Sequence, residues 1–405
     1  MRISKVHLLL LIVFILYPLA SLPLIFIEIY NQKYYSLNYL AFFMGLLGYL
    51  WLPSGDVYRY QLDYEFFKTL SFHDFSYLPK LDLVLPWLLF LFGKAGLNFE
   101  FVRLILCIIS YILYFKIFVD IVQANNHLCE SRRVAFYSFL MFFFFIGFAG
   151  FLTGVRYSLA MSLCFYSVYL IIYKNKGSGW LILILAVITH FSMFLILLIV
   201  FIIKVLKPKI TRFGFIIAII ICYISASLVL KYIIDMIPLN EILKTRILDY
   251  TKEDALVNLS EYSIGLRLSY LFTYVAIYPA LVLVIFKCKY FNYFSVFICI
   301  CISLSLMTDI FTSYNRYAAL GVIFFVIPFL LQYKILFSKF QLYFFVILSF
   351  IVYSASIYTF KKELTYGKEY KIFYLPLPAI LMTTYDLNWL NENIMSDGDL
   401  RLSGK

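Results

Sequence analysis

Long apolar runs separated by short polar connections repeat along almost the whole chain. The clearest runs predict membrane-spanning helices at about 99–122, 134–151, 154–173, 213–234, 267–286, 290–310, 317–332 and 340–360. Two earlier runs cover 7–29, which two prolines interrupt, and 37–52. Strand-like alternation of polar and apolar residues is absent. We therefore predict an all-α, polytopic transmembrane helical bundle with about 10–12 membrane segments.

Two apolar segments fit a full crossing poorly. Segment 84–98 is short and contains a proline and two glycines, which favours an interfacial or half-depth helix. Segment 180–204 is long enough to cross once, but basic loops lie on both sides of it. The positive-inside rule favours the cytoplasm for both loops. We therefore predict that 180–204 is re-entrant, with His190-Phe191-Ser192 near its turn.

This arrangement sorts the charged residues between two faces. The cytoplasmic loops then hold twelve Lys or Arg residues and one acid, Glu130; these loops are 123–133, 174–179, 204–212, 287–289 and 334–339. The loops 53–82 and 235–267 face outward and hold eleven acids. Arg2 and Lys5 favour a cytoplasmic N-terminus, so either 7–29 is a proline-broken hairpin or the rule is violated there. We predict one transmembrane domain, 1–360, and a polar C-terminal tail, 361–405.

Composition excludes several classes of protein. The chain of 405 residues is 64% hydrophobic and 14% charged, which is too few charges to cover a soluble domain of this size. Its net charge of +12 contains no basic block, so we expect no nucleic-acid partner. The seven cysteines lie mostly in apolar segments and form neither a disulfide framework nor a zinc motif. No soluble-enzyme motif is present, and we expect no metal and no cofactor.

The stretch Gly147–Ser192 is almost wholly apolar, yet it contains Arg156 and His190. A charge so close to lipid is costly and usually marks function. Small residues recur every fourth position around Arg156, at Gly150, Gly154, Ser158 and Ser162, and they allow another helix to approach closely. The alternative is that the small residues only pack, and that Arg156 only extends to a lipid headgroup.

Arginines gather on the outward face of the predicted fold: Arg59, Arg156, Arg246, Arg267 and Arg316. Arginine stays charged and offers a planar fork of donors, which suits a phosphate or a diphosphate. For each of them alone, a surface salt bridge is the simpler interpretation.

Acidic and aromatic residues gather in the first outward loop, at Asp56, Tyr60 and Tyr64 beside Arg59. Carboxylates accept hydrogen bonds from sugar hydroxyls, and aromatic rings stack on sugar faces. The alternative is an aromatic belt at the membrane interface. Near the end of a later span, Tyr314 and Arg316 could bind a headgroup or a substrate anion.

Three short motifs carry a resemblance to a known family. The first is GD-x-x-x-Y, at Gly55, Asp56 and Tyr60; the second opens with Arg156 and ends in His190-Phe191-Ser192; the third is Arg316. With this pattern the chain resembles the Wzy-type O-antigen and capsule polysaccharide polymerases, specifically their EpsG-like group. The family often has an arginine before the first glycine, where this chain has Trp51-Leu52-Pro53, and Arg59 is a possible substitute.

The resemblance implies a polymerase that joins undecaprenyl-diphosphate-linked oligosaccharide repeat units at the outer leaflet of the bacterial inner membrane. Arg156 and Arg316 would then hold the diphosphate, Asp56 would orient or deprotonate the acceptor hydroxyl, and His190 would be a second base or a donor to phosphate. Substrate contacts are expected from Arg59, Tyr60, Tyr64, Arg246, Arg267 and Tyr314.

The same resemblance implies membrane lipids as surroundings, and the flippase and chain-length regulator of the pathway as candidate partners. Two other functions stay open at this point. A lipid-linked oligosaccharide flippase also needs buried arginines, and a polyprenyl-phosphate-dependent glycosyltransferase would use paired acids in the first outward loop.

Overall fold

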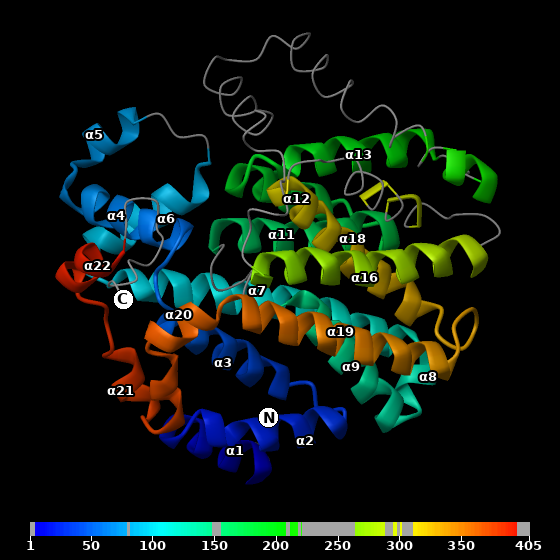
Figure 1. Ribbon diagram of the computed structural model, residues 1–405, viewed down its shortest axis with the longest axis horizontal. Helices are drawn as coiled ribbons and strands as arrows, with labels where there is room; N and C mark the ends of the chain where they lie inside the picture. The colour runs from blue at the N-terminus through cyan, green and yellow to red at the C-terminus, as the bar shows by residue number, and fades with distance from the viewer. Residues whose placement is uncertain are drawn as a thin grey trace. The chain divides into compact units, whose positions relative to one another are not determined.

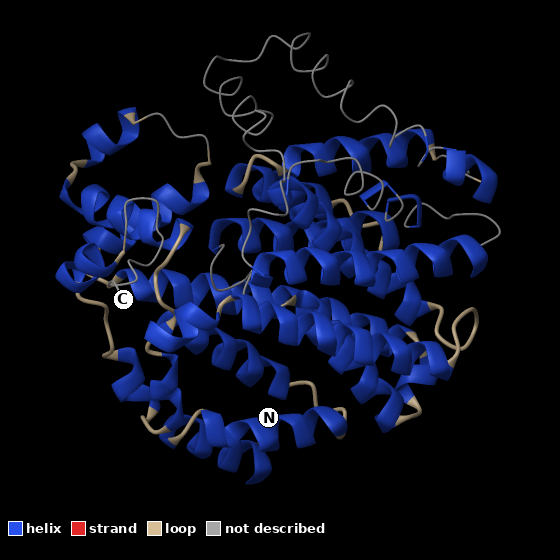
Figure 2. Cartoon of the chain, viewed as in Figure 1, coloured by secondary structure: helices blue, strands red, loops and turns tan. Residues whose placement is uncertain are grey.

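The computed structural model describes residues 5–78, 82–147, 155–207, 211–217, 220, 264–287, 295–297, 300–301 and 311–394. Side chains are described for all of these except 264–275, 311–318 and 362. The described residues are overwhelmingly helical and contain no β-strand, which confirms the all-α prediction (Figure 2).

The chain divides into two compact units. The first unit comprises Met1–Phe136, Gly147–Leu197 and Phe360–Lys405, so it includes the C-terminal tail; the second comprises Tyr137–Ile146 and Leu198–Thr359. Helices of the first unit, coloured mainly blue to green and red in Figure 1, are α1 (Lys5–Leu16), α2 (Leu22–Tyr30), α3 (Ser36–Leu50), α4 (Asp56–Thr69), α5 (Phe72–Tyr77), α6 (Val84–Lys94), α7 (Phe99–Ala124), α8 (Asn126–Cys129), α11 (Val155–Val168), α12 (Ser178–Thr189), α20 (Lys361–Tyr366), α21 (Leu377–Leu381) and α22 (Leu387–Asn393).

The remaining long helices lie wholly or partly in the second unit: α9 (Arg132–Ile146), α13 (Met193–Leu206), α16 (Ile264–Lys287), α18 (Phe311–Leu331) and α19 (Lys339–Thr359). Helix α16 packs on both α18 and α19. Aromatic rings fill part of this core: Phe325 and Phe329 both contact Phe345, with ring centroids 5.1 and 5.3 Å apart. The predicted spans 213–234 and 290–310 lie mostly outside the described residues.

Three described helices are long and apolar enough to cross a membrane: Phe99–Ala124, Val155–Tyr173 and Lys339–Thr359. Helix α19 leaves large apolar side chains exposed, among them Phe340 at 78% and Ile347 at 63%. A soluble protein rarely exposes a helix of this kind, whereas lipid covers it at no cost. The chain is therefore a polytopic membrane protein.

Close helix contacts in the first unit depend on small residues. Gly45 of α3 faces α7, where an added Cβ would lie 2.5 Å from Cγ1 of Ile108. Gly179 of α12 faces the end of α11, where a Cβ would lie 2.9 Å from the Ser167 carbonyl oxygen. Helix α7 thus packs against α3 on one side and α11 on another, and α12 covers α11. Ser158 and Ser162 of the predicted small-residue stripe are buried on α11, while Gly150 and Gly154 lie outside the described residues.

Residues 5–30 form a helical hairpin and not one straight span. The His7 ring lies 4.6 Å from that of Tyr35, and Nε2 of His7 lies 3.2 Å from the Tyr39 hydroxyl. Because α2 ends at Tyr30, both ends of segment 5–30 lie at the start of α3. A straight helix over these residues would be roughly 39 Å long, so the chain must reverse between them. This is the proline-broken hairpin, the first of the two alternatives for the N-terminus.

Segment 84–98 contains α6, and segment 180–204 contains most of α12 and a break after it. Helix α6 has 11 residues and α12 has 12, so each is roughly 17–18 Å long, about half of a bilayer core. Helix α12 ends where His190 takes an extended conformation, with φ −152° and ψ 116°. The chain therefore breaks at the residue where the sequence predicts a turn. The depth of both segments in the membrane stays a prediction.

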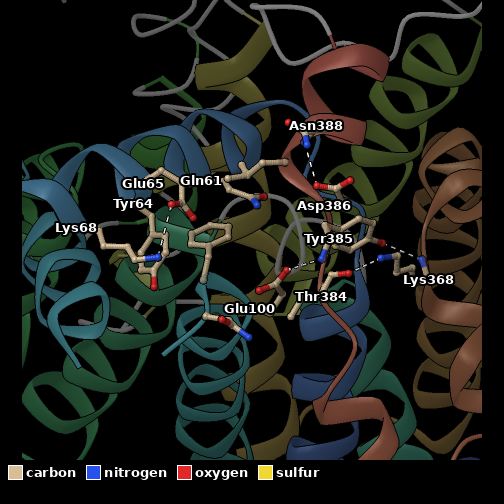
Figure 3. A pocket seen from close by; sticks show the side chains of 13 residues that line it. Gln61, Tyr64, Glu65, Lys68, Glu100, Lys368, Thr384, Tyr385, Asp386 and Asn388 are labelled. Carbon is tan, nitrogen blue, oxygen red and sulfur yellow. Dashed lines mark hydrogen bonds and ion pairs between the residues drawn. The ribbon is translucent and has the colours of Figure 1, made fainter. Parts of the chain in front are cut away.

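The C-terminal tail docks on the junction between α3 and α4. The Tyr385 hydroxyl donates to the Leu50 carbonyl at 2.7 Å. Tyr385 N–H donates to Glu100 Oε1 at 3.0 Å (Figure 3). The backbone N–H of Leu52 donates to Glu369 Oε1 at 3.1 Å. Arg103, which is 1% exposed, donates to the carbonyl oxygens that end α3, at Gly48 and Trp51. These bonds satisfy backbone groups at the end of α3 that the helix leaves open.

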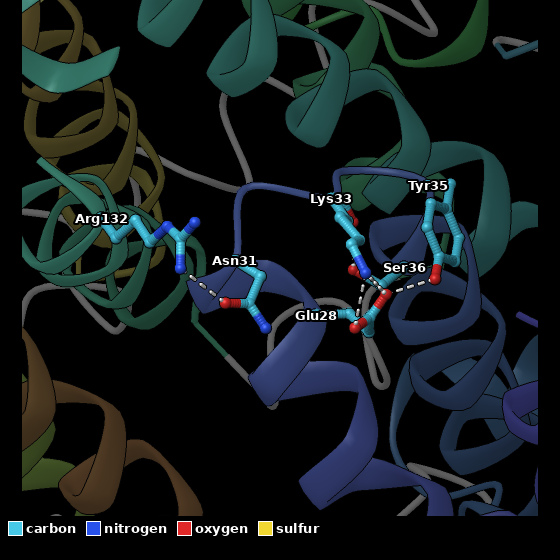
Figure 4. Close-up of polar contacts among 6 residues, drawn as sticks. All are labelled: Glu28, Asn31, Lys33, Tyr35, Ser36 and Arg132. Carbon is cyan, nitrogen blue, oxygen red and sulfur yellow. Dashed lines mark hydrogen bonds and ion pairs between the residues drawn. The ribbon is translucent and has the colours of Figure 1, made fainter. Parts of the chain in front are cut away.

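A second polar contact holds the turn between α2 and α3 (Figure 4). The Glu28 carboxylate is 4% exposed and accepts hydrogen bonds from Lys33 Nζ, at 3.3 Å, and from the Tyr35 hydroxyl. Arg132 Nη1 donates to Asn31 Oδ1 at 3.3 Å and ties this turn to the start of α9. Burial of the Glu28 charge is tolerated because both partners satisfy it.

Candidate functional site

Arg156 lies at the start of α11 and forms an ion pair with Asp82, which lies two residues before α6. Arg156 Nη1 lies 2.6 Å from Asp82 Oδ2, and the two side chains are 29% and 5% exposed. The other carboxylate oxygen, Oδ1, accepts the backbone N–H of Phe191 at 2.9 Å. Leu83 N–H donates to the Ile188 carbonyl at 3.0 Å. These two hydrogen bonds join the residues just before α6 to the end of α12 and the break that follows it. Asp82 therefore holds the guanidinium in a fixed orientation.

One face of α4 lies against the same guanidinium. Arg156 Cζ lies 5.5 Å from the centroid of the Tyr60 ring, within the range of a cation–π contact. Asp56, Tyr60 and Asp63 follow one another at helical spacings of four and three, so they share this face. The residue before the helix is Gly55, the glycine of the GD-x-x-x-Y motif, whose φ of +58° favours glycine.

The Asp63 carboxylate, on the same face of α4, interacts electrostatically with Arg156. Desolvation by the surrounding protein raises the pKa of the Asp63 carboxyl, although the side chain reaches the surface, and the charge of Arg156 opposes this shift. A carboxylate with a raised pKa is a stronger base than an ordinary one. Asp63 is therefore a candidate for proton transfer on this face of α4.

His190 lies in the break after α12, next to Phe191, whose N–H donates to Asp82. Its side chain is 8% exposed, and its ring contacts the edge of Tyr157 with centroids 5.4 Å apart. Ser192 N–H donates to His190 Nδ1 at 3.2 Å, and the Ser192 hydroxyl lies 2.8 Å from the same atom. Since Nδ1 accepts a backbone N–H, the neutral ring carries its proton on Nε2. This tautomer makes Nε2 a donor, as binding a phosphate oxygen requires, and not a base.

We refer to Tyr60, Asp63, Asp82, Arg156 and His190 as the Arg156 centre. Of the residues predicted from sequence, it contains Arg156, His190 and Tyr60. Asp82 was not predicted as a site residue, and Asp63 belongs to the acidic and aromatic loop but was given no role of its own. The only sequence signal for Asp82 is an acid directly before an apolar segment, and for Asp63 it is the seven-residue spacing from Asp56.

Other predicted residues have different surroundings. Asp56 pairs with Arg59 at 3.0 Å, and both side chains are largely exposed. The Tyr64 hydroxyl donates to the Leu97 carbonyl, so this side chain has a structural contact. Arg246 lies outside the described residues. The backbones of Arg267, Tyr314 and Arg316 lie in α16 and α18, and their side chains are outside the described set.

Within the part of the chain that the structure describes, no group of three or more His, Cys, Asp or Glu residues could hold a metal ion. The Arg156 centre instead combines one guanidinium, one imidazole and two carboxylates. The Arg156 Nε atom is buried and has no hydrogen-bond partner among the described residues. The centre therefore offers unused donors to an anion and a carboxylate to a hydroxyl.

Comparison with known proteins gives one match. The sequence model of the EpsG family matches residues 33–372, a range that contains the whole Arg156 centre. No curated protein matches the chain, and no solved structure does.

Proposed function

The chain belongs to the EpsG family, and from this membership and the Arg156 centre we propose that it joins undecaprenyl-diphosphate-linked oligosaccharide repeat units at the outer leaflet of a bacterial inner membrane. The family is one of polysaccharide-polymerase-like membrane proteins with a glycosyltransferase-like activity. The observation that carries the proposal is the Asp82–Arg156 ion pair, which orients an arginine at the end of an apolar helix.

The proposed reaction transfers the glycan from one lipid diphosphate to a sugar hydroxyl on another. The hydroxyl oxygen attacks the anomeric carbon of the donor, and the bond from that carbon to the phosphate oxygen breaks. The electron pair of this bond leaves with the diphosphate. The hydroxyl proton passes to a carboxylate, for which Asp63 is our first choice.

Each residue of the Arg156 centre has a role in this step. Arg156 binds the diphosphate through the donors that Asp82 does not use, and it stabilises the charge that develops on the leaving group. His190 Nε2–H donates to a second phosphate oxygen. Asp56 orients the acceptor hydroxyl from the same face of α4, and Tyr60 presents its ring to a sugar. Arg316 as a second cation remains a prediction from the sequence.

The experiment is a polymerisation assay with the purified full chain in lipid nanodiscs. Lipid-linked repeat units are the only substrate, and a ladder of longer lipid-linked chains is the expected product. Transfer of single sugars from a polyprenyl monophosphate, with no ladder from repeat units, would support a monosaccharide transferase instead. Movement of intact repeat units across the bilayer without new bonds would support a flippase.

A further inference from the structure

A concave site lies on a different face of α4 from the Arg156 centre. It is a cleft of about 610 Å³ between α4, the start of α7 and the C-terminal tail. This volume lies within the usual range for small-ligand sites. Figure 3 shows α4 residues on one side of the cleft and residues 384–388 on the other. None of the family motifs found in the sequence covers the tail.

Helix α4 gives one face to each site. Gln61, Tyr64, Glu65 and Lys68 line the cleft at spacings of three, one and three, so they form one face of the helix. The face that bears Tyr60 is the neighbouring one, since successive residues differ by about 100° around a helix. The cleft and the Arg156 centre therefore lie on adjacent faces of α4.

An unsatisfied polar group points to a ligand in the cleft. Gln61 is 3% exposed, and its side-chain oxygen Oε1 has no hydrogen-bond partner among the described residues. A buried amide oxygen without a partner costs free energy, and a ligand that donates a hydrogen bond removes this cost. Glu100, which is 3% exposed, lines the same cleft.

The charge of the cleft disfavours a phosphate. Its acids are Glu65, Glu100 and Asp386, and its cations are Lys68 and Lys368. Lys68 Nζ lies 3.9 Å from Glu65 Oε2. Lys368 Nζ donates to the Thr384 carbonyl and lies 4.3 Å from the Tyr385 ring centroid. Acids, amides and aromatic rings outnumber the cations. This chemistry suits a neutral ligand with many hydroxyl groups.

We propose that the cleft binds uncharged sugar residues of the lipid-linked glycan, next to the sugar that reacts at the Arg156 centre. The assignment rests on the proposed function, which supplies a glycan as substrate. It gives the C-terminal tail a direct role: residues 384–388 form one wall of the glycan site, and Gln61 accepts a sugar hydroxyl from the opposite wall.

The test uses Gln61→Leu in the full chain. The probe is the free repeat-unit oligosaccharide of the source strain, without lipid or phosphate, and its Kd is measured by titration calorimetry in nanodiscs. We expect binding about tenfold weaker than in the unaltered protein. Thermal stability should be unchanged or higher, because leucine removes an unpaired buried oxygen at similar volume.

Two matched variants make the result specific. Gln32→Leu changes a glutamine whose amide donates to the Cys129 carbonyl at 3.0 Å, and it should leave oligosaccharide affinity unchanged. Arg156→Lys should also bind the free oligosaccharide normally while making no ladder. Three results would overturn the cleft assignment. These are equal affinity of Gln61→Leu and the unaltered protein, no binding to either, and displacement of the oligosaccharide by inorganic diphosphate. If the unaltered protein makes no ladder but its oligosaccharide binding depends on Gln61, the polymerase proposal fails and the glycan site stands.

Discussion

Replacement of Arg156 by lysine separates a catalytic role from a structural one. Lysine keeps the positive charge beside Asp82 and keeps a cation near Tyr60, whose contact with Arg156 is worth about 0.5–1 kcal/mol. It loses the planar fork, and with it the donors that Asp82 leaves unused. Loss of a forked contact to a diphosphate costs about 2–4 kcal/mol, which is roughly a thirtyfold to thousandfold loss of rate.

Alanine at the same position gives a less clear result. It would leave the Asp82 carboxylate, which is 5% exposed, without its partner, and this typically destabilises a protein by about 3–5 kcal/mol. A loss of activity in Arg156→Ala therefore mixes chemistry with folding, whereas Arg156→Lys should insert into the membrane and unfold at a near-normal temperature.

The assay follows the ladder from lipid-linked repeat units at saturating substrate, together with a thermal unfolding measurement. Arg132→Lys is the control, because Arg132 is exposed and donates to Asn31 away from the Arg156 centre. We expect little or no polymer from Arg156→Lys and normal polymer from Arg132→Lys. Near-normal chain lengths from Arg156→Lys would refute the diphosphate role and leave Arg156 as a structural partner of Asp82.

Four further outcomes are expected. Asp63→Asn should lower the polymerisation rate about 10²–10⁴-fold and abolish the acid limb of the pH–rate profile, whereas Asp56→Asn should reduce the rate and keep that limb; an unchanged profile in Asp63→Asn would remove it as the base. Burial raises the pKa of Glu369 to about 7 from an ordinary 4.5, so the folded state binds more protons between these values; unfolding stability should fall by roughly 3 kcal/mol as pH rises through this window, and Glu369→Gln should flatten the curve. A chelator should leave polymerisation intact, and loss of the ladder that magnesium restores would contradict this. A cysteine at position 207 should resist an impermeant thiol reagent added outside intact cells, in a variant without native thiols, and labelling there would mean that 180–204 crosses fully.

The sequence predicts the helical class of this protein well because apolar run length is a direct consequence of bilayer thickness. It also singles out Arg156 and His190, since charges in apolar sequence rarely occur without a function. It interprets 53–82 as a loop, whereas residues 56–69 form α4. The mean apolar content of this helix is low, and its faces acquire meaning only when Arg156 and the tail lie against them.

Asp82 and the tail show what sequence patterns leave out. Nothing in the local pattern tells that Asp82 pairs with a residue 74 positions later, because the pairing depends on how α6 and α11 pack. The docking of Tyr385 on Leu50 and of Glu369 on Leu52 likewise joins segments more than 300 residues apart. Contacts between residues so far apart in the sequence depend on tertiary packing, and short sequence motifs do not predict them.

Because α4 serves two sites with two neighbouring faces, its length is constrained in an unusual way. Segments outside the membrane normally tolerate insertions and deletions. One residue added after Gly55 would rotate every later side chain of α4 by about 100°, which would move Asp63 from the guanidinium and turn Gln61 out of the cleft. Gaps in alignments of relatives with the same arrangement should therefore avoid the fourteen residues from Asp56 to Thr69, even though this helix lies in a polar, surface-exposed part of the chain.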